Sequence, residues 1–72
     1  MSASAGYADI VRMLKKCAAG HNIRRTTHGR RVSFGGRVFP DLTKFDNIEL
    51  GIVRKMCRHF GILECAKESG II

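Results

Sequence analysis

Apolar residues near the start of the chain recur at helical spacing. Apolar residues three or four positions apart would share one face of a helix. They are Tyr7, Ile10, Val11, Leu14, Cys17 and Ala18. Asp9 in the first turn suits the positive end of a helix dipole, and Gly20 supplies a C-terminal stop. The pattern predicts an amphipathic helix over Tyr7–Ala19, preceded by a frayed tail at Met1–Gly6.

The pattern changes to alternation of apolar and polar residues between positions 22 and 42. Gly35 and Gly36 separate two such runs, and two glycines can both take the positive φ angles of a tight hairpin turn. A preceding strand is expected at Ile23–Thr27, ended by a turn at His28–Gly29. Pro40 lacks a backbone donor, so it should end the last strand or lie on a sheet edge.

Helical spacing returns in the last third of the chain. Asp46 is a suitable N-cap, and Glu49 three residues later would complete a capping box. A second helix is therefore expected over Asn47–Phe60, ended by Gly61. A short third helix is expected over Leu63–Ser69.

These elements predict one α+β domain that spans residues 1–72, in the order α-β-β-β-α. The expected architecture is two layers, a three-stranded antiparallel sheet with two helices packed on one face. The other sheet face would remain open. This arrangement resembles the architecture of double-stranded-RNA-binding domains, which contact the nucleic-acid backbone more than the bases.

Charge adds a functional expectation to this fold. The net charge is +7, and no carboxylate lies between Ile10 and Pro40, where most of the basic residues are found. Such asymmetry attracts polyanions. The residues expected to bind nucleic acid are Lys15, Lys16, Arg24, Arg25, Arg30, Arg31 and Arg37. No apolar run approaches the roughly 20 residues of a membrane helix, and no signal peptide is recognised, so a cytoplasmic protein without membrane contact is expected.

The three cysteines, Cys17, Cys57 and Cys65, lack the spacing of a disulfide scaffold. We expect reduced thiols that behave as small apolar side chains in a reducing compartment. A zinc site from Cys57, His59 and Cys65 is disfavoured because the chain has no CxxC pair. Neither a metal nor a cofactor is expected.

His28 is the residue with the clearest chemical potential. It lies at a turn beside Arg30 and Arg31, where an imidazole could move protons while the guanidiniums neutralise a phosphodiester. The competing interpretation is a polar turn histidine that only makes hydrogen bonds. His21 and His59 are weaker candidates.

Three segments resemble the HicA-type mRNA interferase toxins: IVRMLKKCAAG, IRRTTH and IELGIVRKMCRHFGI. The resemblance covers about residues 9–62. It implies a double-stranded-RNA-binding fold, metal-independent mRNA cleavage by His28, and neutralisation by an antitoxin that covers this histidine. The family usually has Gly-Ser before its histidine, where this chain has Thr26 and Thr27.

Two other function classes remain open from the sequence. The segment RKMCRHFGILECAKESGI could form a helix-turn-helix that binds DNA, with the Gly-Gly hairpin as a wing. Alternatively, the basic face could bind an acidic protein, as a small phage-type inhibitor or adaptor would. RNA is expected over DNA.

Overall fold

The computed structural model describes residues 3–72, which form three helices and two antiparallel sheets. The elements in chain order are β1 (Ser4–Gly6), α1 (Tyr7–Cys17), β2 (Asn22–Arg25), β3 (Arg30–Phe34), β4 (Arg37–Leu42), β5 (Asn47–Glu49), α2 (Leu50–Phe60) and α3 (Leu63–Glu68). The α+β class and the three-stranded antiparallel sheet are as predicted. Within the described residues, no helix has the length and apolar character needed to cross a membrane.

The larger sheet is a meander in the order β2-β3-β4. Gly35 and Gly36 join β3 to β4 with φ angles of 60° and 80°, as the predicted tight turn requires. Pro40 lies within β4, which is an edge strand and can tolerate a missing donor. One cross-strand row joins Ile23, Val32 and Phe39, and this row faces the core.

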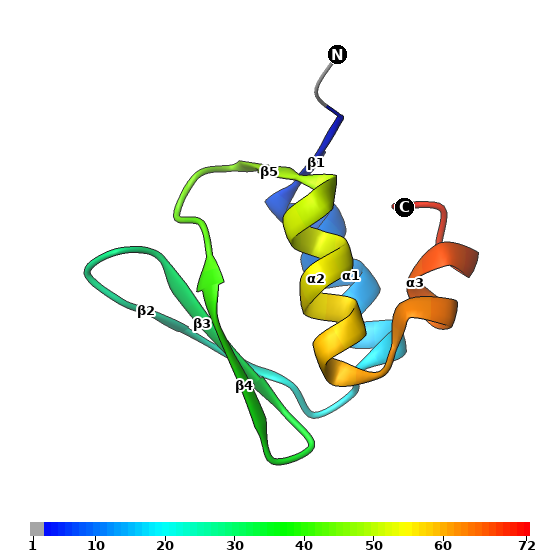
Figure 1. The fold of residues 1–72 in the computed structure, drawn as a ribbon, viewed down its shortest axis with the longest axis horizontal. Coiled ribbons are helices and arrows are strands. Elements are labelled where there is room, and N and C mark those ends of the chain that lie inside the picture. The colour runs from blue at the N-terminus through cyan, green and yellow to red at the C-terminus, as the bar shows by residue number, and fades with distance from the viewer. Residues whose placement is uncertain (1–2) are drawn as a thin grey trace.

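All three helices lie on one side of this sheet, so its other face is open (Figure 1). The helices bury their apolar stripes against each other and against the sheet. Ile10 and Leu14 of α1 and Met56 of α2 are fully buried, and they share one core with Val32 and Leu42. Gly61 ends α2 with a φ of 73°, as expected of a helix C-terminal glycine.

The start of α2 differs from the prediction. Asn47–Glu49 forms β5, which pairs with β1, so α2 begins at Leu50 and no capping box forms. Ser4–Gly6 is therefore a strand, although a frayed tail was expected; Met1 and Ser2 of that tail lie outside the described residues. Hydrogen bonding between distant segments outweighs the local cap signal.

Cys17 and Cys65 form a disulfide, so the expectation of three reduced thiols is wrong for two of them. Their Cα atoms lie 5.7 Å apart, within the range that a disulfide spans. The bond ties the end of α1 to α3. It also removes Cys65 from any zinc site, whereas Cys57 is a free, buried thiol as expected.

Candidate nucleic-acid interface

Two arginines dominate the sheet face that the helices leave uncovered. Arg24 on β2 lies directly opposite Arg31 on β3, and both are exposed. We define the open face by the residues that share this side of the strands: Asn22, Arg24, Arg31, Ser33 and Val38. In residues 3–72 the only ion pair joins Asp9 to Arg12, so neither open-face arginine is neutralised by a carboxylate of the described chain.

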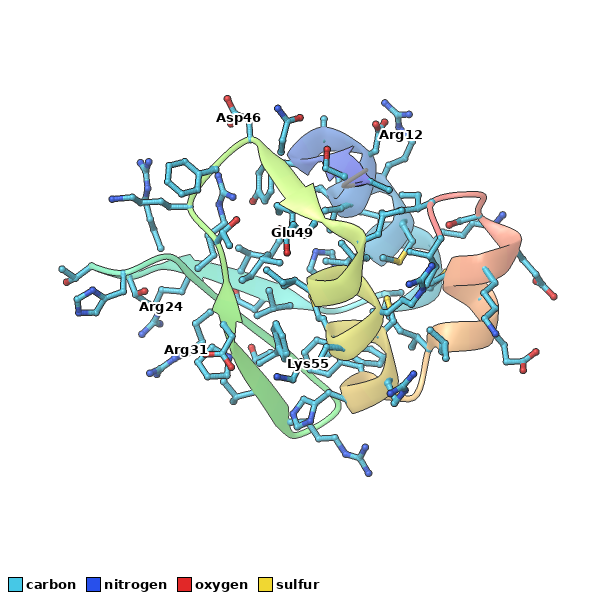
Figure 2. All side chains as sticks on the ribbon, turned by 45° about the horizontal axis from the view of Figure 1, so that its top comes forward. Arg12, Arg24, Arg31, Asp46, Glu49 and Lys55 are labelled. Atoms are coloured by element: carbon cyan, nitrogen blue, oxygen red, sulfur yellow. A yellow bond between two sulfur atoms is a disulfide. The ribbon has the colours of Figure 1, made fainter. Side chains whose placement is uncertain are left out.

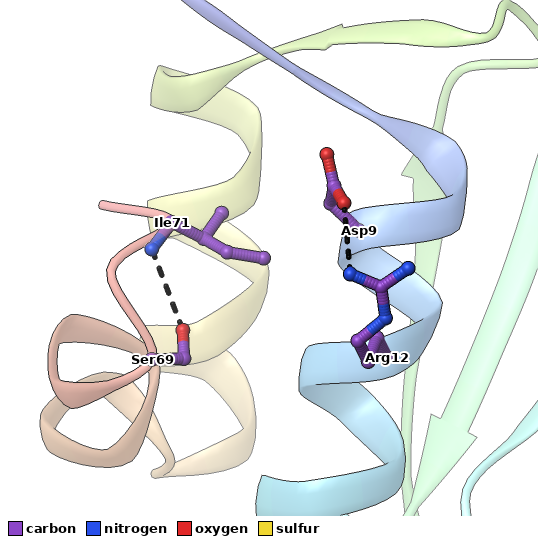
Figure 3. A network of polar contacts seen from close by, with 4 residues as sticks. All are labelled: Asp9, Arg12, Ser69 and Ile71. Carbon is purple, nitrogen blue, oxygen red and sulfur yellow. Dashed lines mark hydrogen bonds and ion pairs between the residues drawn. The ribbon is translucent and has the colours of Figure 1, made fainter.

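Figure 2 shows the open-face arginines and Arg12 on opposite sides of the molecule. Lys16 lies one helical turn after Arg12. Both line a groove of about 540 Å³ beside the C-terminal residues Ser69 to Ile71. In Figure 3, the Asp9–Arg12 pair faces this segment, in which the Ile71 N–H donates to Ser69 Oγ. Lys15 and Lys16 are exposed near the end of α1, and Lys16 belongs to this second basic region.

Arg30 lies on the opposite sheet face from Arg31 and is only 9% exposed. Its guanidinium donates to the carbonyl oxygens of Thr43 at 2.9 Å and Phe45 at 3.1 Å. The same group lies 3.7 Å from the centre of the Tyr7 ring, a cation–π contact. Arg30 therefore holds the loop between β4 and β5. Because its guanidinium is buried and already bonded, this geometry does not support the expected role of Arg30 as a nucleic-acid ligand.

Arg25 and Arg37 differ from Arg30 in being exposed. Arg25 is the cross-strand partner of Arg30 at the end of β2. Arg37 donates to the His59 carbonyl at 2.8 Å, and the His59 ring lies 2.8 Å from the Val38 carbonyl, to which its Nε2–H donates. These two bonds fasten the hairpin to the end of α2, so His59 has a structural partner.

His28 is exposed in the loop that joins the two arginine-paired strands. A backbone bond from the Thr26 N–H to the Gly29 carbonyl, 2.8 Å long, closes the turn around it. Gly29 is packed so closely that a Cβ there would lie 2.5 Å from the Leu42 carbonyl oxygen. The turn is thus seated against the end of β4, with the imidazole directed outside the core.

Sequence reasoning assigned no role to two further exposed features. One is Phe45, a residue that is 65% exposed and follows the exposed Lys44. The other is the outer side of α2, where Arg54, Lys55 and Arg58 are exposed. The sequence did offer a signal for Phe45: it is a lone aromatic residue between a lysine and an aspartate, in a segment expected to be a loop.

Comparison of the chain with protein-family models, with curated proteins and with solved structures finds no match.

Proposed function

We propose that the open face binds the phosphate backbone of RNA. The observation that carries this proposal is the pairing of Arg24 with Arg31, two like charges directly opposite each other. Repulsion between such a pair lowers the free energy of unfolding by about 0.2–1 kcal/mol. A phosphate between the two guanidiniums would relieve the repulsion and accept charge-assisted hydrogen bonds from both.

RNA is favoured over DNA as the ligand by the chemistry of the adjacent turn. His28 follows β2 and precedes β3, so its imidazole lies at the end of the same two strands. RNA carries its own nucleophile, the 2′-OH, and a histidine that moves protons beside cations could cleave it without a metal. The resemblance to HicA-type toxins supports the same assignment of His28.

The cations have separate roles in this proposal. Arg24 and Arg31 hold the phosphate, whereas Arg25, exposed at the end of β2 on the Arg30 side of the sheet, would contact RNA only where it passes the sheet edge. Arg37, Lys15 and Lys16 would contact only a longer RNA that continues around the molecule. Arg30 supports the neighbouring loop from within.

The test compares two double variants that change the net charge equally. Arg24→Glu/Arg31→Glu should abolish the shift of a labelled RNA, whereas Lys15→Glu/Lys16→Glu should weaken it only modestly. Equal losses in the two variants would mean that binding follows net charge, and the open face would not be the site. The slope of log affinity against log salt should also fall by about two in the first variant.

His28→Ala separates cleavage from binding when the RNA is incubated with EDTA. Cleavage by wild type and not by the variant would support a metal-independent endoribonuclease. Binding without cleavage by either protein would leave a non-catalytic RNA-binding module.

An acidic protein, such as an antitoxin, would use the same arginines and should compete with RNA. No observation favours a helix-turn-helix, because α3 has six residues and is tied to α1 by the disulfide. An mRNA substrate implies a cytoplasmic site of action, where thiol reductants would attack the Cys17–Cys65 bond.

A further inference from the structure

The loop between β4 and β5 presents an aromatic ring that the proposed phosphate site does not use. Phe45 is 65% exposed, and the one other large apolar side chain exposed among residues 3–72 is Val38, at 46%. Lys44, the preceding residue, is also exposed. An exposed phenyl ring lacks the stabilisation that burial would provide. A ligand with a flat apolar face could supply it by covering the ring.

This loop is held rigidly from below. The two bonds from Arg30 reach the carbonyls on either side of Lys44, at Thr43 and Phe45. The next carbonyl, of Asp46, accepts the Tyr7 N–H at 2.7 Å. Three backbone positions around the exposed ring are therefore fixed, which lowers the entropy lost when a ligand binds to it.

The same loop adjoins the turn that carries His28. The ideal Cβ position at Gly29 lies 2.5 Å from the Leu42 carbonyl oxygen and 3.7 Å from the Lys44 nitrogen. The two loops lie at the same end of the sheet in Figure 1. The loop that carries Lys44 and Phe45 and the turn that carries His28 are therefore neighbours at one end of the sheet.

We propose that Phe45 stacks on an unpaired base of the RNA, so that the ligand of this surface is single-stranded. The inference rests on the proposed function, in which nearby arginines hold the phosphates. A ring beside a basic track is the arrangement by which proteins bind single strands, because every unpaired base offers a π face. In a duplex, base pairing and stacking keep those faces from the ring.

The first measurement is the affinity of wild type and Phe45→Ala for an unstructured RNA and for a duplex of the same length. Phe45→Ala should bind the single strand about 5- to 100-fold more weakly and the duplex as wild type does. Glu64→Ala, at an exposed residue of α3 outside the open face, should bind both RNAs as wild type does. Because Phe45 is exposed, its variant should unfold at the wild-type temperature.

A gain-of-signal variant gives an independent readout. The chain has no tryptophan, so Phe45→Trp introduces a single indole at the proposed stacking position. Its fluorescence should be quenched by the single strand, and its affinity should equal or exceed that of wild type. Unchanged single-strand affinity in Phe45→Ala, or an equal loss on both RNAs, would overturn the stacking proposal while leaving the phosphate site intact. Absence of RNA binding by wild type would instead overturn both.

Discussion

Arg24 and Arg31 lie directly opposite each other on neighbouring antiparallel strands, on the one sheet face that no helix covers. Their Cβ atoms are therefore expected about 5 Å apart, close enough for the charges to repel. In the proposed function, this pair lowers stability in exchange for phosphate binding. Substitution at one of them should separate the two properties.

Arg24→Glu should raise stability and lower RNA affinity. The glutamate would form a cross-strand ion pair with Arg31, which we expect to increase the free energy of unfolding by about 0.2–1 kcal/mol. It would also repel phosphate. Urea unfolding and RNA binding in one buffer measure both effects, and Arg24→Gln should give intermediate values. A lower unfolding free energy for Arg24→Glu would contradict the inferred repulsion.

Arg30→Met should be strongly destabilising, in contrast to Arg31→Met. The substitution removes the donor to the Thr43 and Phe45 carbonyls and the contact with Tyr7. We expect a loss of about 2–4 kcal/mol in unfolding free energy, because two acceptors lose a charged partner. Arg31→Met lies on the exposed face and relieves the repulsion with Arg24, so it should leave stability unchanged or raise it by up to about 1 kcal/mol. Similar effects of the two variants in urea would show that the buried bonds contribute little.

Gly29→Ala and Gly51→Ala should have opposite effects. A Cβ at Gly29 would lie 2.5 Å from the Leu42 carbonyl oxygen, so the backbone must shift, at a cost of about 1–3 kcal/mol. Gly51 lies in the first turn of α2 with no atom near its Cβ position. Alanine there should stabilise by up to about 1 kcal/mol. Thermal unfolding of the pair provides the comparison, and a tolerated alanine at position 29 would mean that the turn is loosely packed.

Features specified by neighbouring residues could be predicted from the sequence. The hairpin follows from Gly35 and Gly36, whose positive φ angles are a local requirement, and α2 ends at Gly61 for the same reason. The open face follows from alternation in β3, where Arg31 is exposed and Val32 is buried. His28 was correctly expected at a turn, and the structure places it there with its side chain exposed.

Features that depend on distant partners were missed. The Asp46–Glu49 segment reads as a cap until its pairing with Ser4–Gly6 is known. Arg30 appears equivalent to Arg31 in the sequence, but its acceptors are 13 and 15 residues away. Spacing alone could not pair Cys17 with Cys65, because their separation is 48 residues and only the packing of α3 against α1 brings them together.

Loss of the Cys17–Cys65 bond should destabilise the protein substantially. The closed loop of 48 residues corresponds to about 4 kcal/mol in the chain-entropy model, a large part of the stability of a domain this small. Cys17→Ser/Cys65→Ser and reduced wild type should therefore both unfold at lower urea. Adding reductant to the double variant should have no further effect. An unchanged midpoint on reduction of wild type would refute this contribution.

Burial raises the pKa of the Cys57 thiol from 9.0 to about 11. Between these values the unfolded chain loses the thiol proton while the folded chain keeps it, so the unfolded state binds fewer protons and stability falls as pH rises. The contribution is fully present below pH 9 and is lost by pH 11, amounting to about 2–3 kcal/mol.

Comparison of wild type with Cys57→Ala isolates this contribution from other titrating groups. Folding and unfolding rates, measured by stopped flow before thiolate exchange with the disulfide begins, give the unfolding free energy at each pH. The stability advantage of wild type over Cys57→Ala should shrink by about 2–3 kcal/mol between pH 8.5 and pH 11. Parallel pH profiles of the two proteins would mean that the thiol is ionised as readily in the folded protein as in the unfolded chain.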